Sequence, residues 1–272
     1  MTPKQDEDLS RAVKLLENPS LGARIADVIG TPIEKAIALL PAKANEMIAT
    51  AAHKAILGSV LLATKTMRDH TPGGATLVPE SSDWWHIGAI ALSGFGGGCF
   101  GLPALIVELP LSTTIIMRSV ADIARSEGAN LSQLETRLEC IQVLALGGKN
   151  SSDDEADIGY FVAREALAKA VSNAAAHIAK NGLAQEEAPA LVRMIIRIAE
   201  RYSITVTDKA AAQLMPIIGG LGGALINTIF ISHFQDVARG HFTVKRLERE
   251  VGAKQVKERY AEICKLQGSK GA

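Results

Sequence analysis

Two long stretches without any Asp, Glu, Lys or Arg constrain how this chain can fold. They cover residues 87–107 and 210–235, and each contains a cluster of glycines. Glycine disfavours a helix by about 1 kcal/mol relative to alanine, so a glycine-rich helix must gain stability elsewhere. Close packing of two helix backbones supplies this stability, because glycine has no side chain to separate the helices. We therefore expect these glycines at helix–helix contacts: Gly94, Gly96, Gly97, Gly98, Gly219, Gly220, Gly222 and Gly223.

The composition predicts helices around these two stretches. Hydrophobic residues make up 47% of the 272 residues and aromatic residues only 4%, so the core is aliphatic, and Ala and Leu favour helices. We predict an all-α fold, a multi-helix bundle around two glycine-rich apolar helices or helical hairpins. Residues 1–20 are expected to form an N-terminal helical extension, and residues 21–272 a single domain with basic C-terminal helices. We expect one short extended piece at Ser203–Thr207, and a helix end at Asn181-Gly182.

Charge and cysteine usage bound the location and the partners of the chain. The 29 Lys and Arg balance the 29 Asp and Glu, so no net field attracts nucleic acid. Cys99, Cys140 and Cys264 fit no zinc or disulfide pattern, which indicates a reducing compartment. The N-terminus is polar and acidic and lacks the apolar core of a signal peptide. We expect a cytoplasmic protein that is peripheral at the inner face of the cell membrane, with integral insertion as the alternative.

The glycine clusters do not match the known phosphate-binding loops. The Walker loop requires Gly-Lys-Ser/Thr, and the dinucleotide loop requires the spacing Gly-x-Gly-x-x-Gly. No Gly-Lys-Ser/Thr occurs here, and the cluster Gly94-Phe95-Gly96-Gly97-Gly98 lacks both patterns. Gly96, Gly98 and Gly101 have the dinucleotide spacing, but the strand that must precede such a loop is not predicted. The six histidines form no HExxH or i,i+4 pair. The sequence therefore predicts no cofactor and no metal.

Contact with a membrane is a further interpretation of the uncharged stretches. Both reach the roughly 20 residues that a membrane span needs. Three arrangements stay open: the packed core of a soluble domain that touches a membrane, a hairpin that enters one leaflet, and true spans. Trp84 and Trp85 precede the first stretch, where interfacial aromatic residues sit. Lys245, Arg246 and Arg249 are candidates for contact with anionic headgroups, although interleaved glutamates weaken that attraction and a solvated face is the alternative.

Polar residues beside or inside the uncharged stretches are candidate site residues. Glu108 directly follows an apolar run, where a carboxylate needs a partner, and Arg118 is the plausible one. Asp122 and Asp236 each precede an arginine by three positions, the spacing of an ion pair on a helix. Asn227 is expected to hydrogen-bond to a neighbouring helix. For each residue a structural role and a ligand-binding role stay open.

Similar short sequences accompany the two uncharged stretches. Thr113-Thr114-Ile115-Ile116 and Asp122-Ile123-Ala124-Arg125 follow the first stretch. Asn227-Thr228-Ile229-Phe230 and Asp236-Val237-Ala238-Arg239 lie within and just after the second. The two glycine clusters align with these pieces only through an 11-residue gap. A structural repeat and a mere likeness of composition both stay open.

Several short motifs follow one another in a specific order between residues 25 and 262. They are the glycine-rich residues 94–101, Glu108-Leu109-Pro110, Arg118 with Ile123-Ala124, Val206-Thr207-Asp208-Lys209, residues 216–227 and residues 241–247. In this order they resemble the EcsC family of bacteria, named for a protein encoded beside an ABC transporter. Glu108 stands where the family commonly has Asp, and Lys245 where it commonly has Arg. The resemblance implies an all-helical fold and a membrane-linked context, and it implies no established activity.

These observations lead to one expected function and two alternatives. We expect a membrane-associated, non-enzymatic helical protein that binds lipid or assists a transport system. One alternative is a hydrolase-like enzyme in which Glu108 acts with Asp122 or His233 as acid and base. The other is a soluble partner of an ABC transporter. The expected partners are membrane lipid or a membrane transport protein and not nucleic acid, and the sequence indicates no oligomeric state.

Overall fold

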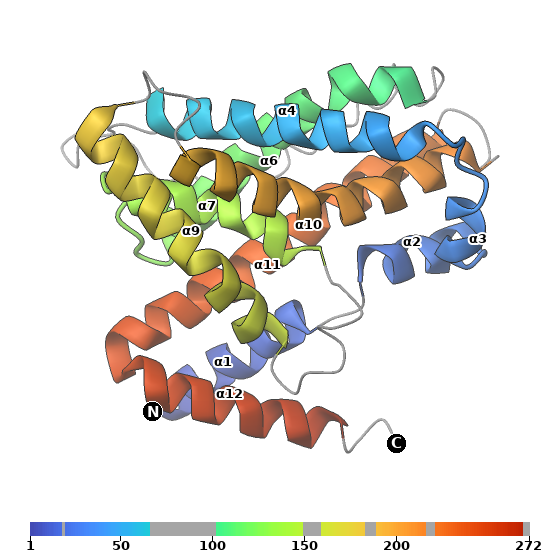
Figure 1. Cartoon of the computed structure of the whole chain (residues 1–272). Coiled ribbons are helices and arrows are strands. Elements are labelled where there is room, and N and C mark those ends of the chain that lie inside the picture. The colour runs from blue at the N-terminus through green and yellow to red at the C-terminus, as the bar shows by residue number, and fades with distance from the viewer. Residues whose placement is uncertain (18–19, 66–101, 149–158, 183–188, 216–220, 269–272) are drawn as a thin grey trace, which may run out of the picture.

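A computed structural model describes residues 1–17, 20–65, 102–148, 159–182, 189–215 and 221–268 (Figure 1). Every regular element within these ranges is a helix, which confirms the predicted all-α fold. The helices are α1 (Pro3–Leu16), α2 (Leu21–Ile29), α3 (Ile33–Ile37), α4 (Ala44–Lys65), α6 (Leu102–Ser126), α7 (Leu134–Leu146), α9 (Gly159–Asn181), α10 (Pro189–Leu214), α11 (Leu221–Val251) and α12 (Ala253–Gly268).

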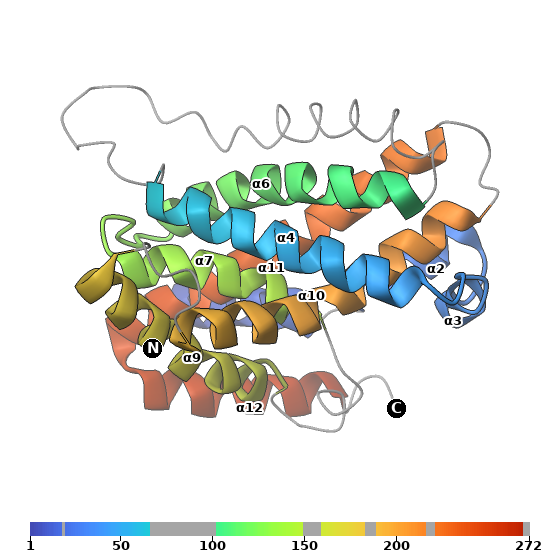
Figure 2. The same ribbon diagram turned by 45° about the horizontal axis from the view of Figure 1, so that its top comes forward.

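Helix α10 lies at the centre of a multi-helix bundle. It packs against α2, α3, α4, α7, α9 and α11. Helices α4 and α6 lie against each other on one side of the molecule, and α1 and α12 lie on the opposite side (Figures 1 and 2). The long helix α11 packs against α6 at one side and against α1 and α12 at the other, so it joins both sides of the bundle.

The core is mostly aliphatic, and one of its aromatic clusters joins α10 to α11. Tyr202 of α10 and Phe230 and Phe234 of α11 are fully buried. The ring centroids of Phe230 and Phe234 are 5.1 Å apart, and those of Tyr202 and Phe234 are 5.6 Å apart, both in edge-to-face geometry. Such pairs are more favourable than face-to-face stacks because the positive ring edge meets the negative ring face. The cluster therefore fixes α10 against α11.

The extended piece expected at Ser203–Thr207 is wrong, because these residues form the middle of α10. The hydroxyl of Ser203 donates to the carbonyl oxygen of Ala199, and that of Thr207 donates to the carbonyl oxygen of Ser203. These bonds keep the hydroxyls within the helix. Thr205 and Val206 are buried. Packing of this segment against its neighbours thus outweighs the weak preference of β-branched residues for strands.

Two glycines end helices where the backbone turns left-handed. Helix α9 ends at Asn181, and the following Gly182 has φ +70°, which confirms the helix end predicted at Asn181-Gly182. Gly252 has φ +96° and separates α11 from α12. A residue with a Cβ is strained in this conformation, so glycine is the residue that permits both turns.

Helix α1 shares the core of the later helices. Leu9, Ala12 and Val13 are almost fully buried, and α1 packs against α11 and α12. The predicted division of the chain near residue 20 stays a prediction, although α1 buries its apolar face against the rest of the bundle.

Among the described residues, one helical stretch is long and apolar enough to cross a membrane. It is Ala44–Thr64 of α4, with a mean hydropathy of 1.4, and 44% of its most apolar window is buried inside the protein. Core helices of soluble proteins have the same length and composition. This helix is therefore weak evidence for a membrane span.

Gly240 of α11 sets the distance to α1. A Cβ placed on Gly240 would lie 2.6 Å from Cγ of Leu16 and 3.2 Å from the carbonyl oxygen of Ala12. Real Cβ atoms do not approach other atoms as closely as the first of these distances, so α1 would have to move.

We predict that Gly240→Ala lowers the free energy of unfolding by about 1–3 kcal/mol, because overpacking separates α1 from α11. Urea denaturation of the purified chain measures this change. Gly58→Ala is the matched control, since Gly58 lies inside α4 and an added Cβ meets no atom within 4 Å. The control is expected to raise the free energy of unfolding by about 0.5–1 kcal/mol. Equal effects of the two substitutions would contradict the close packing at Gly240.

Candidate functional site

An ion pair is buried between α6 and α10. Nζ of Lys209 donates to Oε1 and Oε2 of Glu108, at 2.9 Å each. The side chain of Lys209 is 0% exposed and that of Glu108 is 10% exposed. Burial lowers the pKa of the Lys209 ammonium, and the Glu108 carboxylate opposes part of that shift. A charge in such surroundings is tolerated because its partner is in direct contact.

Aromatic and hydroxyl side chains enclose the pair. Nζ of Lys209 lies 4.6 Å from the centroid of the Phe230 ring, so the ammonium meets the negative face of an α11 side chain. The hydroxyl of Thr113 donates to the carbonyl oxygen of Leu109, at 2.6 Å. The Tyr202 hydroxyl, 2.8 Å from Oγ1 of Thr113, is therefore the donor of their shared hydrogen bond. Burial raises the pKa of Tyr202, which keeps this donor protonated.

The expectation that Arg118 pairs with Glu108 is wrong. Arg118 is exposed, and it lies ten residues farther along α6, about 15 Å along the helix axis. The partner of Glu108 is Lys209, 101 residues away in the sequence. One signal in the sequence points to this pair: Glu108 directly follows the first uncharged stretch, and Lys209 directly precedes the second.

The groups of the hydrolase alternative are not brought together. Asp122 lies 14 residues after Glu108 on the same helix, about 21 Å away along its axis, and it pairs with Arg125 at 3.0 Å. Nε2 of His233 is 2.9 Å from the carbonyl oxygen of Gly147, to which it donates. The three side chains thus occupy separate places in the fold. Within the described ranges, no three His, Cys, Asp or Glu side chains are placed to hold a metal ion.

Asn227 and Asp236, both on α11, have contrasting surroundings. Asp236 is 3.1 Å from Nη1 of Arg24 on α2 and 3.6 Å from Nη1 of Arg239, so it holds α2 against α11. Asn227 is 1% exposed, and neither its amide nitrogen nor its amide oxygen has a hydrogen-bond partner in the described part of the chain. The expected bond is therefore not formed with any of the described helices. An unsatisfied buried polar group costs about 1–3 kcal/mol.

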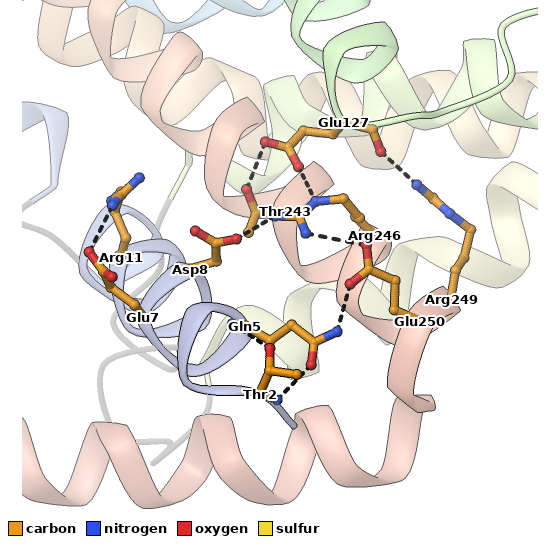
Figure 3. Close-up of polar contacts among 10 residues, drawn as sticks. All are labelled: Thr2, Gln5, Glu7, Asp8, Arg11, Glu127, Thr243, Arg246, Arg249 and Glu250. Carbon is orange, nitrogen blue, oxygen red and sulfur yellow. Dashed lines mark hydrogen bonds and ion pairs between the residues drawn. The ribbon is translucent and has the colours of Figure 1, made fainter.

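Arg246 of α11 lies at the centre of an ion-pair cluster (Figure 3). Its Nε is 2.7 Å from Oε2 of Glu127, which directly follows α6, and its Nη2 is 2.9 Å from Oδ2 of Asp8 on α1. Its Nη1 is 3.3 Å from Oε1 of Glu250. The planar guanidinium donates in fixed directions, so one side chain joins α1, α11 and the end of α6.

Lys245 and Arg249 also bond within the protein. Nζ of Lys245 is 2.8 Å from Oε1 of Glu139 on α7, and Nη2 of Arg249 donates to the carbonyl oxygen of Glu127, at 2.7 Å. Carboxylates of other helices thus balance much of the basic charge of this region. The contact of Lys245, Arg246 and Arg249 with lipid headgroups stays a prediction.

Part of the predicted site lies outside the described residues: Trp84, Trp85, Gly94, Gly96, Gly97, Gly98, Gly219 and Gly220. Gly222 and Gly223 belong to the first turn of α11, where Gly222 is buried and Gly223 is half-buried.

Asp208 precedes Lys209 and faces another side of α10. The backbone N–H of Gly22, in the first turn of α2, donates to its carboxylate. Burial and, second, the nearby charge of Glu34 raise the pKa of Asp208 to about 7 despite this hydrogen bond. Asp208 therefore keeps its proton over a pH range in which an ordinary aspartic acid is ionised. Sequence analysis missed this residue, because burial against α2 is a tertiary contact.

The family model described as the EcsC protein family matches residues 5–247 of the 272-residue chain. This range runs from α1 into α11 and includes both Glu108 and Lys209. No curated protein and no solved structure matches the chain.

We predict that Lys209→Met lowers the free energy of unfolding by about 3–5 kcal/mol, because the Glu108 carboxylate then lacks its partner. Adding Glu108→Gln to this variant is expected to restore part of the loss, since the remaining side chains are neutral. Denaturation of both single variants and of the double variant gives the coupling energy between the two sites. Strictly additive losses would show that the two charges do not stabilise each other.

We also predict that Asp208 makes stability depend on pH. The pKa of Asp208 is raised from 3.8 in the unfolded chain to about 7 in the folded one, so its contribution to stability is complete only below the unfolded pKa and is lost as the pH rises from there to about 7. Asp208→Asn lacks this loss, and at pH 8 it should exceed the wild type by up to about 4 kcal/mol. Urea denaturation of both chains from pH 4 to pH 8 measures the difference. A difference that stays constant with pH would contradict the raised pKa.

Proposed function

The chain belongs to the EcsC protein family, and from this premise we propose that it is a membrane-associated helical protein without a catalytic centre of its own. Its partner is membrane lipid, and its place is peripheral at the cytoplasmic face of the cell membrane. The membrane-linked context that the family resemblance implies agrees with this proposal.

The observation that carries the proposal is an uncharged end of the molecule. We define the uncharged end as residues 109–117 of α6, residues 210–215 of α10 and residues 221–232 of α11, none of which is Asp, Glu, Lys or Arg. The Lys209 contacts with Glu108 and Phe230 bring these three segments together. The two charges that adjoin them, Glu108 and Lys209, neutralise each other in the interior.

The opposite side of the molecule is rich in ion pairs. Besides the cluster around Arg246, Arg164 of α9 binds Glu248 through two hydrogen bonds of 2.9 Å and 2.7 Å. Arg259 of α12 binds Asp6 of α1. Water can solvate the charged side chains on this side, whereas the uncharged end has no ionic groups for water to solvate. The proposal therefore assigns lipid contact to the uncharged end and a structural role to the paired arginines.

Single exposed apolar residues are common on soluble proteins and carry no argument alone. Leu111 and Leu225, which are 53% and 44% exposed, differ because they lie within the uncharged end. Half-buried Ile115 and Ile229 are near them on the same helices. Transfer of such side chains from water into hydrocarbon is favourable by about 1.5–3 kcal/mol for each fully buried side chain. The same region thus supplies a driving force for lipid association.

Flotation of the purified full chain with lipid vesicles tests the proposal. We predict that the chain floats with vesicles of phosphatidylcholine as well as with vesicles that contain phosphatidylglycerol, and that 0.5 M salt changes the bound fraction by less than about twofold, because apolar contact is not screened. A chain that stays at the bottom of the gradient with both lipids would refute membrane association.

A further inference from the structure

Helices α6 and α11 match each other in sequence and in burial. Residues 111–125 align with residues 225–239 at a constant offset of 114, and Leu, Thr, Ile, Asp, Ala and Arg recur at equivalent positions. In 13 of the 15 aligned pairs the two residues are both buried, both half-buried or both exposed. Agreement in burial is not expected from composition alone. The two helices therefore present equivalent faces to the core and equivalent faces outward.

The outward faces begin as apolar stripes. Leu111 and Leu225 are the most exposed positions of the apolar part, and Ile115 and Ile229 follow one turn later as half-buried residues. Polar groups between them are satisfied within the helix. The hydroxyl of Thr114 donates to the carbonyl oxygen of Pro110, and that of Thr228 to the carbonyl oxygen of Ala224, at 2.9 Å each.

Both stripes carry an Asp–Arg pair at the same position. Asp122 pairs with Arg125 at 3.0 Å, and the equivalent Asp236 pairs with Arg239 at 3.6 Å. From each exposed leucine to the aspartate are 11 residues, about 16 Å along the helix axis. That length matches one leaflet, since the hydrocarbon core of a bilayer is about 30 Å thick. Arg118 lies between these levels on α6, and a long arginine side chain extends its charge toward the headgroups.

The two helices start at the same end of the molecule and run in the same general direction (Figure 2). Near their starts, Lys209 contacts both Glu108 of α6 and Phe230 of α11. Farther along, Nε2 of Gln235 donates to Oγ of Ser119, at 2.9 Å. The apolar parts of both stripes thus lie at one end, and the charged parts follow together.

We propose that the N-terminal halves of α6 and α11 enter one lipid leaflet as a pair, with Leu111 and Leu225 among the acyl chains and the two Asp–Arg pairs at the headgroups. This inference rests on the membrane association proposed above and names the surface that carries it. Lipid is the partner that fits, because both stripes lose their apolar character over the depth of a leaflet and leave no unpaired hydroxyl among the threonines to be desolvated. Glu108, three residues before Leu111 on α6, is already paired with Lys209 inside the protein.

Vesicle binding of matched leucine variants tests the inference. Leu111→Lys and Leu225→Lys should each weaken the partition of the full chain into phosphatidylcholine vesicles by about tenfold or more, and their combination should weaken it further. Leu266→Lys is the control, since Leu266 of α12 is 57% exposed but lies on the ion-paired side. Circular dichroism and urea denaturation confirm that each variant folds as the wild type does.

A second measurement does not depend on a loss of binding. The three native cysteines are replaced, and a single cysteine at position 111, 225 or 266 carries a fluorescent label. Quenching of this label by nitroxide lipids reports how deep the labelled position lies in the bilayer. We expect strong quenching at positions 111 and 225 and none at position 266. If the wild type floats but Leu111→Lys and Leu225→Lys bind equally well and labels 111 and 225 are not quenched, the insertion surface is refuted while membrane association stands. If the wild type does not float, the proposed function itself fails.

Discussion

The ion pair between Glu108 and Lys209 is the interaction on which the uncharged end depends. Either charge alone would be too costly in the interior, and together they need close geometry to offset the loss of hydration. The contact joins α6 to α10, and the Phe230 ring adds α11. Three helices whose adjoining residues are uncharged are thus held together at one place. The described side chains around this ion pair hold the three helices together by apolar packing, without a further ionic group.

The other side of the molecule is stabilised in a different way. There, Arg246, Arg259 and Arg164 bind carboxylates from other helices, and these contacts fix direction as well as distance. Gly240 lets α1 approach α11 closely enough to share the core. The molecule therefore separates its charges: one side gains specificity from ion pairs, and the other gains stability from burial of apolar surface. The proposed lipid contact rests on this separation.

The sequence was sufficient for features that depend on local interactions. The helical class follows from aliphatic composition, the end of α9 follows from Gly182, and the pairing of Asp122 with Arg125 follows from their spacing. Features that depend on tertiary contacts were not predictable in this way. The helix through Ser203–Thr207 is imposed by packing, and Lys209 meets Glu108 only because the tertiary fold brings the two side chains together across α10 and α6. Their positions beside the uncharged stretches were the one available signal for that pair.

Hydrogen exchange of the full chain, with and without phosphatidylcholine vesicles, tests most directly which side of the molecule lipid covers. The account predicts that vesicles slow the exchange of backbone amides in residues 109–117 and 221–232 and leave the exchange of α12 unchanged, because lipid excludes water from the uncharged end. Slower exchange in α12 with no change in the first halves of α6 and α11 would contradict it.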